Sequence, residues 1–207
     1  MRSLECFAAG IAYSQSGSVT RETTPALCSR YGAVAAISGD FFNFRDSGRI
    51  VRNGQLLKNT KSSEDVCALY ADGGMETYSP DEFDINAALA RGLWQSWGFG
   101  PALLSSEGIP LESFNSTVNT RNPRSAVGYY EPGHYCFVTV DGRQTGYSAG
   151  MTMAQLADLF YQMGCKAAFN LDGGQTAVMA WMGETANIPY KGGRRVSDIL
   201  MILDIDA

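Results

Sequence analysis

Histidine is almost absent from this sequence, which has a single one at position 134. A Ser-His-Asp or Cys-His mechanism would have to use that residue, and the chain has no G-x-S-x-G segment to carry a serine nucleophile. The H-E-x-x-H and EF-hand motifs are missing as well. We therefore interpret His134, which follows Pro132 and Gly133, as a solvated turn residue, and we expect no two-metal centre of clustered His and Asp.

Paired cysteine motifs are also missing. None of the five cysteines forms a C-x-x-C pair, which excludes zinc-ribbon and thioredoxin-like centres. The odd count leaves at least one thiol unpaired within the chain. Cys136 and Cys165 lie inside apolar runs, so we interpret the cysteines as buried free thiols. A Cys6–Cys28 bridge is the alternative that the sequence leaves open.

Long apolar runs and basic tracts do not occur. No stretch approaches the roughly 18 consecutive apolar residues of a transmembrane helix, so none is expected. The first residues carry one arginine and an interrupted apolar patch, which is unlike a signal peptide. The net charge of -5 and the lack of a lysine-rich tract argue against a nucleic-acid partner, which needs a basic surface.

The composition is that of a folded chain, with 45% hydrophobic residues, 18% charged residues and 23 glycines. Helices are expected in residues 21–31, starting near Thr24, in 79–92 behind Ser79 as N-cap, and in 151–164 behind a capping box. Strands are expected in 33–38, 124–131, 135–140, 165–171, 177–182 and 196–205, with hairpins turning at 53–54 and 72–74. We predict one α+β domain over residues 1–207, with a mixed, largely antiparallel β-sheet core flanked by a few helices.

Acidic residues recur at the ends of the apolar strands. Asp40, Asp141 and Asp172 each follow such a strand, and the last two are followed by glycine. Ligands are often bound at strand ends, because side chains converge there on a rigid scaffold. Each Asp-Gly pair alone also fits a simple turn, and we interpret Asp72 with its two glycines that way.

Isolated arginines accompany these acids. Arg124, Arg143 and Arg195 each adjoin a buried-looking segment instead of lying in a charge run. Guanidinium groups bind phosphate or carboxylate through two parallel hydrogen bonds. Arginines, carboxylates and glycine-rich turns together predict a site for a phosphorylated or acidic ligand.

These segments resemble the phosphodiester glycosidase family. The matching stretches stand in family order from about residue 33 to 202: AISGDFFNF, GRIVRNGQLL, WGFGPALL, NPRSAVGYY, the block from Asp141 to Met179, and NIPYKGGRRVSDILMI. The long block is the most specific of them. The departures are Ser38, where the family usually has Asn, and Gln175 to Ala177, where it has small residues. We expect these positions to distinguish this chain from its relatives.

The resemblance implies a hydrolase that cleaves the anomeric C–O bond of a sugar-1-phosphodiester similar to GlcNAc-1-phosphodiester, in a small or polymeric phosphosugar. The alternative is a non-catalytic phosphoglycan-binding or envelope-assembly module on the same fold. The family includes bacterial proteins of exopolysaccharide biosynthesis, so the resemblance implies an extracytoplasmic, secreted or cell-envelope location. No cofactor and no metal ligand are expected, although a single divalent cation on aspartates remains an alternative. The sequence gives no oligomeric state.

The same resemblance assigns roles to the residues of the strand ends. Asp172 would activate water or stabilise the sugar cation, and Asp141 would be a second carboxylate or orient Arg143. Arg124 and Arg143 would hold the phosphate, with the amides of Gly173 and Gly174 completing the anion site. The remaining predicted substrate-binding residues are Asp40, Phe42, Asn170, Thr176 and Ser148. An ion pair between Arg195 and Asp198 would fix the last strand.

Overall fold

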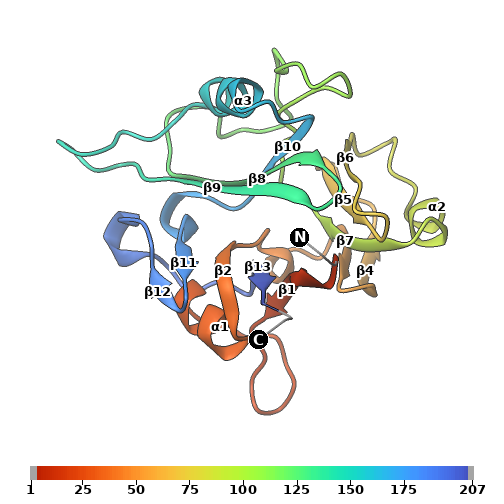
Figure 1. Ribbon diagram of the computed structural model, residues 1–207, viewed down its shortest axis with the longest axis horizontal. Coiled ribbons are helices and arrows are strands. Elements are labelled where there is room, and N and C mark those ends of the chain that lie inside the picture. Colours follow the sequence, from red (N-terminus) through yellow and green to blue (C-terminus); the bar gives the residue numbers. More distant parts are fainter. Residues whose placement is uncertain (1–3, 205–207) are drawn as a thin grey trace.

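Three antiparallel sheets and three α-helices form the described part of the computed structural model, residues 4–204 (Figure 1). The first sheet has the order β1 (Phe7–Ile11), β13 (Asp198–Leu203), β2 (Ala33–Ser38), β11 (Met179–Trp181), β12 (Glu184–Thr185). The second sheet has the order β10 (Ala167–Asn170), β8 (Arg124–Glu131), β9 (His134–Val140). The third sheet has the order β4 (Gln55–Thr60), β3 (Gly48–Arg52), β7 (Leu93–Trp97), β5 (Val66–Tyr70), β6 (Met75–Tyr78). This confirms the predicted α+β class with a largely antiparallel core and few helices.

Local turn signals account for the hairpins. Asn53 and Gly54 join β3 to β4, and both have positive φ angles, 51° and 76°. A two-residue turn of that handedness matches the twist of the flanking strands. In the β5–β6 hairpin the Asp72 carboxylate accepts the Gly74 N–H at 2.8 Å, so Asp72 belongs to a turn as expected.

Two of the three predicted helices start where their caps indicate. Thr23 caps α1 (Thr24–Arg30), and the Thr152–Gln155 capping box opens α3 (Met153–Gln162). The expectation for Ser79 is wrong, because α2 (Ile85–Ala90) begins behind Asp84. The Asp84 carboxylate accepts the N–H groups of the helix start, whereas Ser79 donates both its N–H and its hydroxyl to Glu82 in a separate turn.

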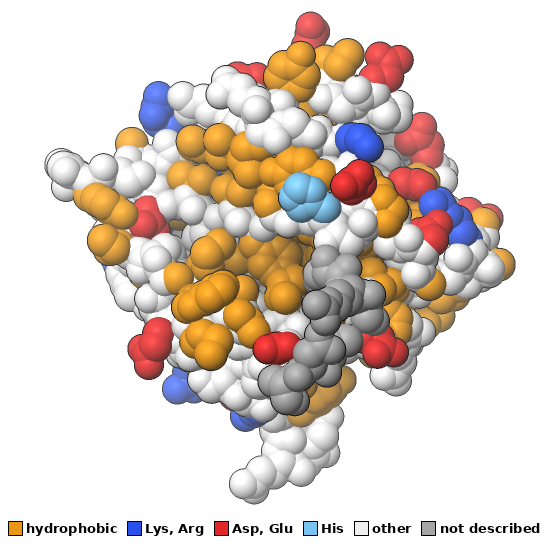
Figure 2. All heavy atoms as spheres, viewed as in Figure 1, with side chains coloured by type: hydrophobic (Ala, Val, Ile, Leu, Met, Phe, Trp, Pro, Cys, Tyr) orange, Lys and Arg blue, Asp and Glu red, His pale blue; other side chains and the backbone are white. Residues whose placement is uncertain are grey.

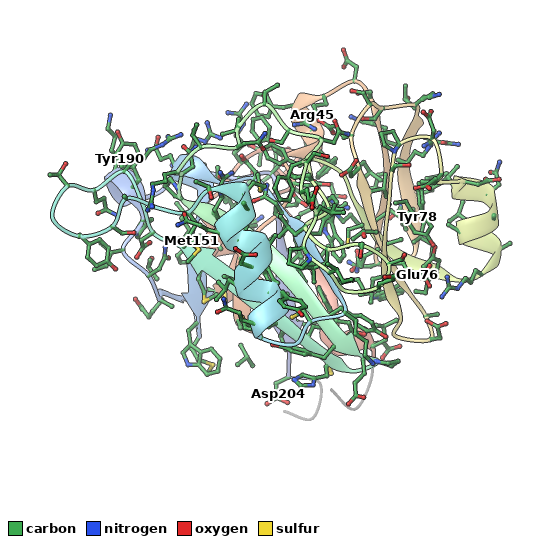
Figure 3. The ribbon with its side chains drawn as sticks, turned by 90° about the horizontal axis from the view of Figure 1, so that it is seen from above. Arg45, Glu76, Tyr78, Met151, Tyr190 and Asp204 are labelled. Atoms are coloured by element: carbon green, nitrogen blue, oxygen red, sulfur yellow. The ribbon has the colours of Figure 1, made fainter. Side chains whose placement is uncertain are left out.

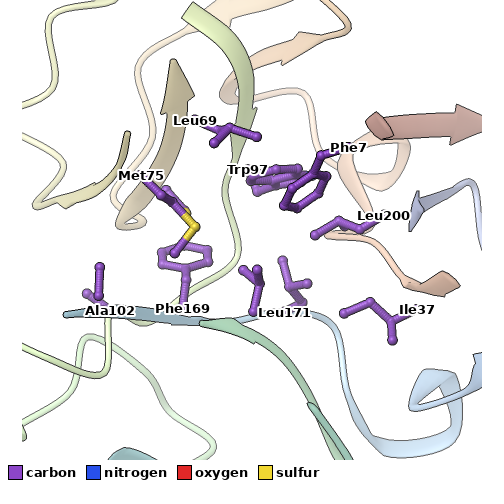
Figure 4. Close-up of a cluster of buried hydrophobic side chains, with 12 residues drawn as sticks. Phe7, Ile37, Leu69, Met75, Trp97, Ala102, Phe169, Leu171 and Leu200 are labelled. Atoms are coloured by element: carbon purple, nitrogen blue, oxygen red, sulfur yellow. The ribbon is translucent and has the colours of Figure 1, made fainter. Parts of the chain in front are cut away.

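One apolar core joins the sheets. Phe7 and Leu200 from the first sheet meet Phe169 from the second and Leu69 and Trp97 from the third, all of them fully buried (Figure 4). Helix α3 lies on the outer face of the β10-β8-β9 sheet, and α1 packs against the first sheet (Figure 1). Because the strands of all three sheets pack into this one core, they are fixed relative to one another. The side chains at their ends are therefore held in defined positions.

The cysteine interpretation is confirmed, whereas His134 is exposed as expected but is the first residue of β9 and not a turn residue. All five cysteines are free thiols, four of them buried, so a Cys6–Cys28 bridge is not formed. His134 is exposed on the face shown in Figure 2, stacked on Tyr130 with the ring centroids 4.2 Å apart.

Candidate functional site

Three of the polar residues predicted for the site meet at one end of the β10-β8-β9 sheet. The β8–β9 register places Arg124 opposite Val140, and β10 runs antiparallel to β8 on the other side. The ends of β9 and β10 therefore flank the beginning of β8. Arg124 opens β8, Arg143 follows β9 and Asp172 follows β10, which brings one carboxylate and two guanidinium groups together.

A cavity of about 170 Å³ lies between these residues. It is lined by Phe99, Ser116, Val118, Asn122, Pro123, Arg124, Arg143, Met153, Asn170, Asp172, Gly173 and Gly174. Met151 lies just before the N-cap of α3, and Tyr190 and Arg45 lie on the same side of the molecule, beyond the N-terminal end of that helix (Figure 3). The cavity is small for an enzyme site, where about 300–1,000 Å³ is usual for a drug-sized ligand.

Asp172 is the one carboxylate among the described residues that line this cavity. Its side chain is buried, and burial raises its pKa because the charged form loses hydration. The Thr176 hydroxyl and the positive charges of Arg194 and Arg45 act in the opposite direction. The Asp172 Oδ2 atom lies 3.4 Å from Nη2 of Arg194. A carboxylate with a raised pKa is a stronger base than a free one, which suits acid–base chemistry.

Arg124 is buried without a carboxylate partner among the described residues. It donates to the carbonyls of Met151 at 3.0 Å, Val118 at 3.0 Å and Thr120 at 2.6 Å. Burial, together with the nearby charge of Arg143, lowers the pKa of Arg124 to about 10. The guanidinium therefore stays protonated at neutral pH, held in place by neutral oxygens. An anion in the cavity would be stabilised by this uncompensated charge.

Arg143 is held by a side chain that the sequence prediction did not include. Its Nε and Nη2 atoms donate to Oδ1 of Asn122 at 3.0 and 2.6 Å. Arg143 has a φ of 58°, which is costly for a residue with a side chain. The guanidinium lies close to Gly174, where a Cβ atom would be 3.4 Å from Nη1, and 5.6 Å from the Tyr190 ring centroid. No carboxylate pairs with Arg143 among residues 4–204.

Asn170 lines the cavity and has a buried side-chain oxygen without a hydrogen-bond partner among the described residues. Its Nδ2 atom donates to the Gly100 carbonyl at 2.8 Å. Its Oδ1 atom is buried and has no hydrogen-bond partner within the described chain. A buried polar atom without a partner is costly, so a hydroxyl group of a ligand would be favoured there.

The two glycines after Asp172 are required by close packing more than by ligand contact. A Cβ atom on Gly173 would lie 2.6 Å from the Pro123 carbonyl oxygen, and Gly174 has a φ of 63°. The Gly174 N–H donates to that same carbonyl at 2.9 Å, so it is used within the protein. The Thr176 hydroxyl donates to the Gly173 carbonyl. The Gly173 N–H can therefore donate to a bound anion as predicted. The Gly174 N–H cannot, because it already donates to Pro123.

Asp141 and Ser148 lie outside the lining of this cavity. The Asp141 carboxylate accepts hydrogen bonds from the Asn187 side chain at 2.7 Å, the Tyr147 hydroxyl at 2.9 Å and the Ile188 N–H at 3.0 Å. Ser148 donates to the Asp141 carbonyl at 2.6 Å. The structure therefore uses Asp141 to join two loops, and Arg143 is oriented by Asn122 instead.

Asp40 and Phe42 also turn away from the cavity. Both Asp40 and Asp198 bind Arg52, at 2.6 and 2.9 Å, in a fully buried ionic triad. The predicted Arg195–Asp198 pair is wrong, because Arg52 reaches Asp198 from β3 and Arg195 is exposed. Phe42 packs in the core beside Ile11 and Ile50. Asp40 and Phe42 thus support the site from behind.

Arg194 and Asn122 are the residues near the site that the sequence did not reveal, and Arg45 is a third basic residue close to Asp172. Arg194 stands next to Arg195, and nothing in the sequence distinguishes the two. Arg45 forms an ion pair with Glu64, and its guanidinium lies 4.8 Å from the ring of Phe99, a cavity residue. The pattern that could have indicated Asn122 is its place two residues before Arg124.

The described residues contain neither a cluster of metal ligands nor a membrane-spanning helix. No group of three or more His, Cys, Asp or Glu side chains in residues 4–204 is arranged to hold a metal ion. Within the same range no helix is both long and apolar enough to cross a membrane.

Solved structures share this fold at low sequence identity. The catalytic domain of zebrafish N-acetylglucosamine-1-phosphodiester alpha-N-acetylglucosaminidase, auto-inhibited by its pro-peptide, is 20% identical with a TM-score of 0.78, covering 97% of this chain and 74% of that one. A chain from Burkholderia pseudomallei named "Putative exported protein" is 15% identical with a TM-score of 0.65, covering 96% and 71%. A hypothetical protein from Synechocystis is 16% identical with a TM-score of 0.60, covering 95% and 56%.

Sequence comparison gives the family. The SPbeta prophage-derived uncharacterized protein YomE of Bacillus subtilis (strain 168) is 30% identical over 198 residues, which is 90% of this chain. The chain spans 30% of the length of that relative. The family model described as phosphodiester glycosidase matches residues 31–203, a range that holds all the cavity residues. The chain therefore belongs to the phosphodiester glycosidase family.

Proposed function

We propose that this chain hydrolyses a sugar-1-phosphodiester at the anomeric C–O bond and releases the free sugar and a phosphomonoester. The observation that carries the proposal is one buried carboxylate, Asp172, facing a cavity with two guanidinium groups that no described carboxylate neutralises. The membership of the family supports this reaction type. The name of the zebrafish relative supports GlcNAc as the sugar to be tested first.

The two arginines would bind the phosphodiester and stabilise the leaving group. When the C1–O bond breaks, its electron pair goes to the phosphate oxygen, which becomes more negative. Arg124 and Arg143 already hold their charges in place with neutral partners, so little reorganisation is needed at that moment. A phosphate monoester is a good leaving group, and strong acid catalysis at its oxygen is less important.

Asp172 would serve the sugar side of the same bond. Its carboxylate stabilises the positive charge that develops at C1 and takes a proton from the water whose oxygen forms the new bond to C1. The unpaired Oδ1 atom of Asn170 would accept a sugar hydroxyl. No second carboxylate lines the described cavity, so we assign no stereochemical outcome.

An Asp172→Asn substitution tests this role. The variant keeps the shape of the side chain but loses the charge and the base, so kcat for a GlcNAc-1-phosphodiester should fall about 100-fold or more. The matched control is Asp158→Asn, an exposed aspartate on α3, which should leave turnover unchanged. Full turnover by the Asp172 variant would contradict the proposal.

Oxygen-18 water identifies the bond that breaks. Label in the released sugar supports anomeric C–O cleavage, and label in the phosphate would mean P–O cleavage by a phosphodiesterase. Tight binding of the substrate without any release of sugar would instead indicate a phosphoglycan-binding module. Gln175, one of the departures from the family pattern, donates to the Gly193 carbonyl at 2.9 Å and is not among the residues that line the cavity.

Location and cofactor use belong to the same proposal. An extracytoplasmic or cell-envelope location fits a phosphosugar substrate and is supported by the shared fold with the Burkholderia chain. Cell fractionation with an antibody against the chain would decide it. Turnover should persist after dialysis against a chelator, and loss of turnover that a divalent cation restores would show that a cation takes part.

A further inference from the structure

A second cavity adjoins the first at Arg143. This outer cavity is an open surface hollow of about 600 Å³, lined by Arg121, Arg143 and the loop of residues 144–149. Arg143 lines both cavities, so this guanidinium stands where they meet. The segment after β9 that carries this loop extends beyond the end of the sheet in Figure 1.

Hydrogen bonds hold the loop of residues 144–149, which forms the wall of this outer cavity. Within the loop, Gln144 and Ser148 exchange backbone hydrogen bonds at 2.9 and 3.0 Å. The Gln144 side chain donates to the Ile188 carbonyl at 2.7 Å, and the Tyr147 hydroxyl donates to Asp141 at 2.9 Å. Asp141, which the sequence placed in the catalytic centre, thus positions this loop. A loop held at both ends can present a preformed surface to a ligand.

The charge of the outer cavity is positive. Its described lining contains two arginines and no acidic residue. The Arg121 side chain is exposed and makes no ion pair or hydrogen bond with any residue in the range 4–204. It precedes Asn122, the residue that holds Arg143, so the two guanidinium groups are presented to the same space from connected positions.

We propose that the outer cavity binds the alcohol portion of the phosphodiester and that this portion carries a second anionic group, which Arg121 binds. The inference rests on the proposed function and specifies its substrate class. The inner cavity of about 170 Å³ accommodates the sugar, Arg143 contacts the bridging phosphate, and the outer cavity of about 600 Å³ takes a longer chain. Phosphorylated alcohols, including polymers in which phosphodiesters recur, have this chemistry.

Two synthetic substrates test the inference. One is the GlcNAc-1-phosphate ester of 1-propanol, and the other is the same ester of 3-phosphooxy-1-propanol. Wild-type kcat/KM should be about tenfold higher for the phosphorylated substrate, as a charge-assisted contact provides. In Arg121→Gln the ratio of the two kcat/KM values should fall to about one, and Arg121→Lys should keep part of the preference. Added salt should weaken the preference of the wild-type protein.

The control is Arg30→Gln, an arginine paired with Glu22 on a different part of the surface, which should keep the wild-type preference. Equal kcat/KM values for the two substrates in the wild-type protein would overturn the inference. A tenfold preference that persists in Arg121→Gln would also overturn it.

A binding measurement separates this inference from the proposed reaction. If neither ester is hydrolysed, the proposed function fails, and calorimetric titration with propane-1,3-diyl bisphosphate and with propyl phosphate still tests the outer cavity. The wild-type protein should bind the bisphosphate about fivefold more tightly than the monophosphate. The Arg121→Gln variant should bind the two compounds with equal affinity. Equal affinity in the wild-type protein would refute the second anion site.

Discussion

At the scale of single residues, burial and nearby cations have opposite effects on the pKa of Asp172. Burial raises its pKa, and the charge of Arg194 opposes that rise. Removing the cation in Arg194→Gln should therefore raise the pKa of Asp172 further. Because the reaction needs the charged carboxylate, the acidic limb of the log(kcat/KM)–pH profile should move to higher pH in this variant.

The adjacent arginine is a matched control for that shift. Arg195 is exposed and its side chain is not among the partners of Asp172, so Arg195→Gln should leave the acidic limb in place. An acidic limb that stays put in Arg194→Gln, or moves to lower pH, would show that Arg194 does not act on Asp172. Equal shifts in both variants would indicate a general loss of surface charge.

The sequence shows which residues have the right chemistry for the site. It does not show in which direction their side chains point. Asp40 and Asp172 both follow a buried strand and look equivalent in the sequence. Asp172 faces the cavity, while Asp40 is turned inward by Arg52, the Gly98 N–H and the Phe42 N–H. The direction depends on partners far along the chain, and no local pattern contains that information.

At the scale of elements, the turn after β10 depends on close contact between two backbones. A Cβ atom at Gly173 would lie 2.6 Å from the Pro123 carbonyl oxygen, which is backbone and cannot rotate away. Gly173→Ala should lower the free energy of unfolding by about 2 kcal/mol, within the range for overpacking, and should also displace Arg124. Urea unfolding measures the first effect, and kcat/KM measures the second.

Gly146 provides the comparison for this substitution. It has a φ of 81° and open space around its Cβ position, so Gly146→Ala meets backbone strain without a clash. Its cost should be about 1 kcal/mol. A Gly173→Ala variant as stable as the wild-type protein would show that the turn moves away from Pro123 easily.

Local signals explain which elements the sequence predicts well. The Asn53–Gly54 turn and the Thr152–Gln155 capping box involve neighbours in the chain, so their patterns can be read directly. The start of α2 is missed because two capping candidates, Ser79 and Asp84, lie five residues apart and only packing decides between them. β1 and β7 are missed because their pairing comes from distant strands of the first and third sheets.

At the scale of the whole molecule, the Arg52–Asp40–Asp198 triad joins two sheets behind the site. Arg52 ends β3 of the third sheet, and Asp198 begins β13 of the first. A Cβ atom on Gly39 would overlap the Asp198 carboxylate, which explains why the Ser38-Gly39-Asp40 segment needs glycine. The Ser38-Gly39-Asp40 segment therefore holds the first and third sheets together, and its contribution to the site is indirect.

The triad should make stability depend on pH. Two buried carboxylates share one guanidinium, and burial raises the pKa of Asp198 from 3.8 to about 7. The folded protein then holds a proton that the unfolded chain releases near pH 4. The stability that Asp198 contributes is complete below about pH 4, falls as the pH rises, and is lost above about pH 7.

An Asp198→Asn substitution isolates this effect, because the amide resembles the protonated acid at every pH. Urea unfolding between pH 5 and pH 8 should show the wild-type free energy of unfolding falling relative to that of the variant, by at most about 1.4 kcal/mol per pH unit and mainly below pH 7. Asp158→Asn on the exposed face of α3 should follow the wild-type curve. A difference between wild type and Asp198→Asn that stays constant from pH 5 to pH 8 would mean that Asp198 is charged throughout, so that Arg52 neutralises both carboxylates well enough to keep them ionised in the core.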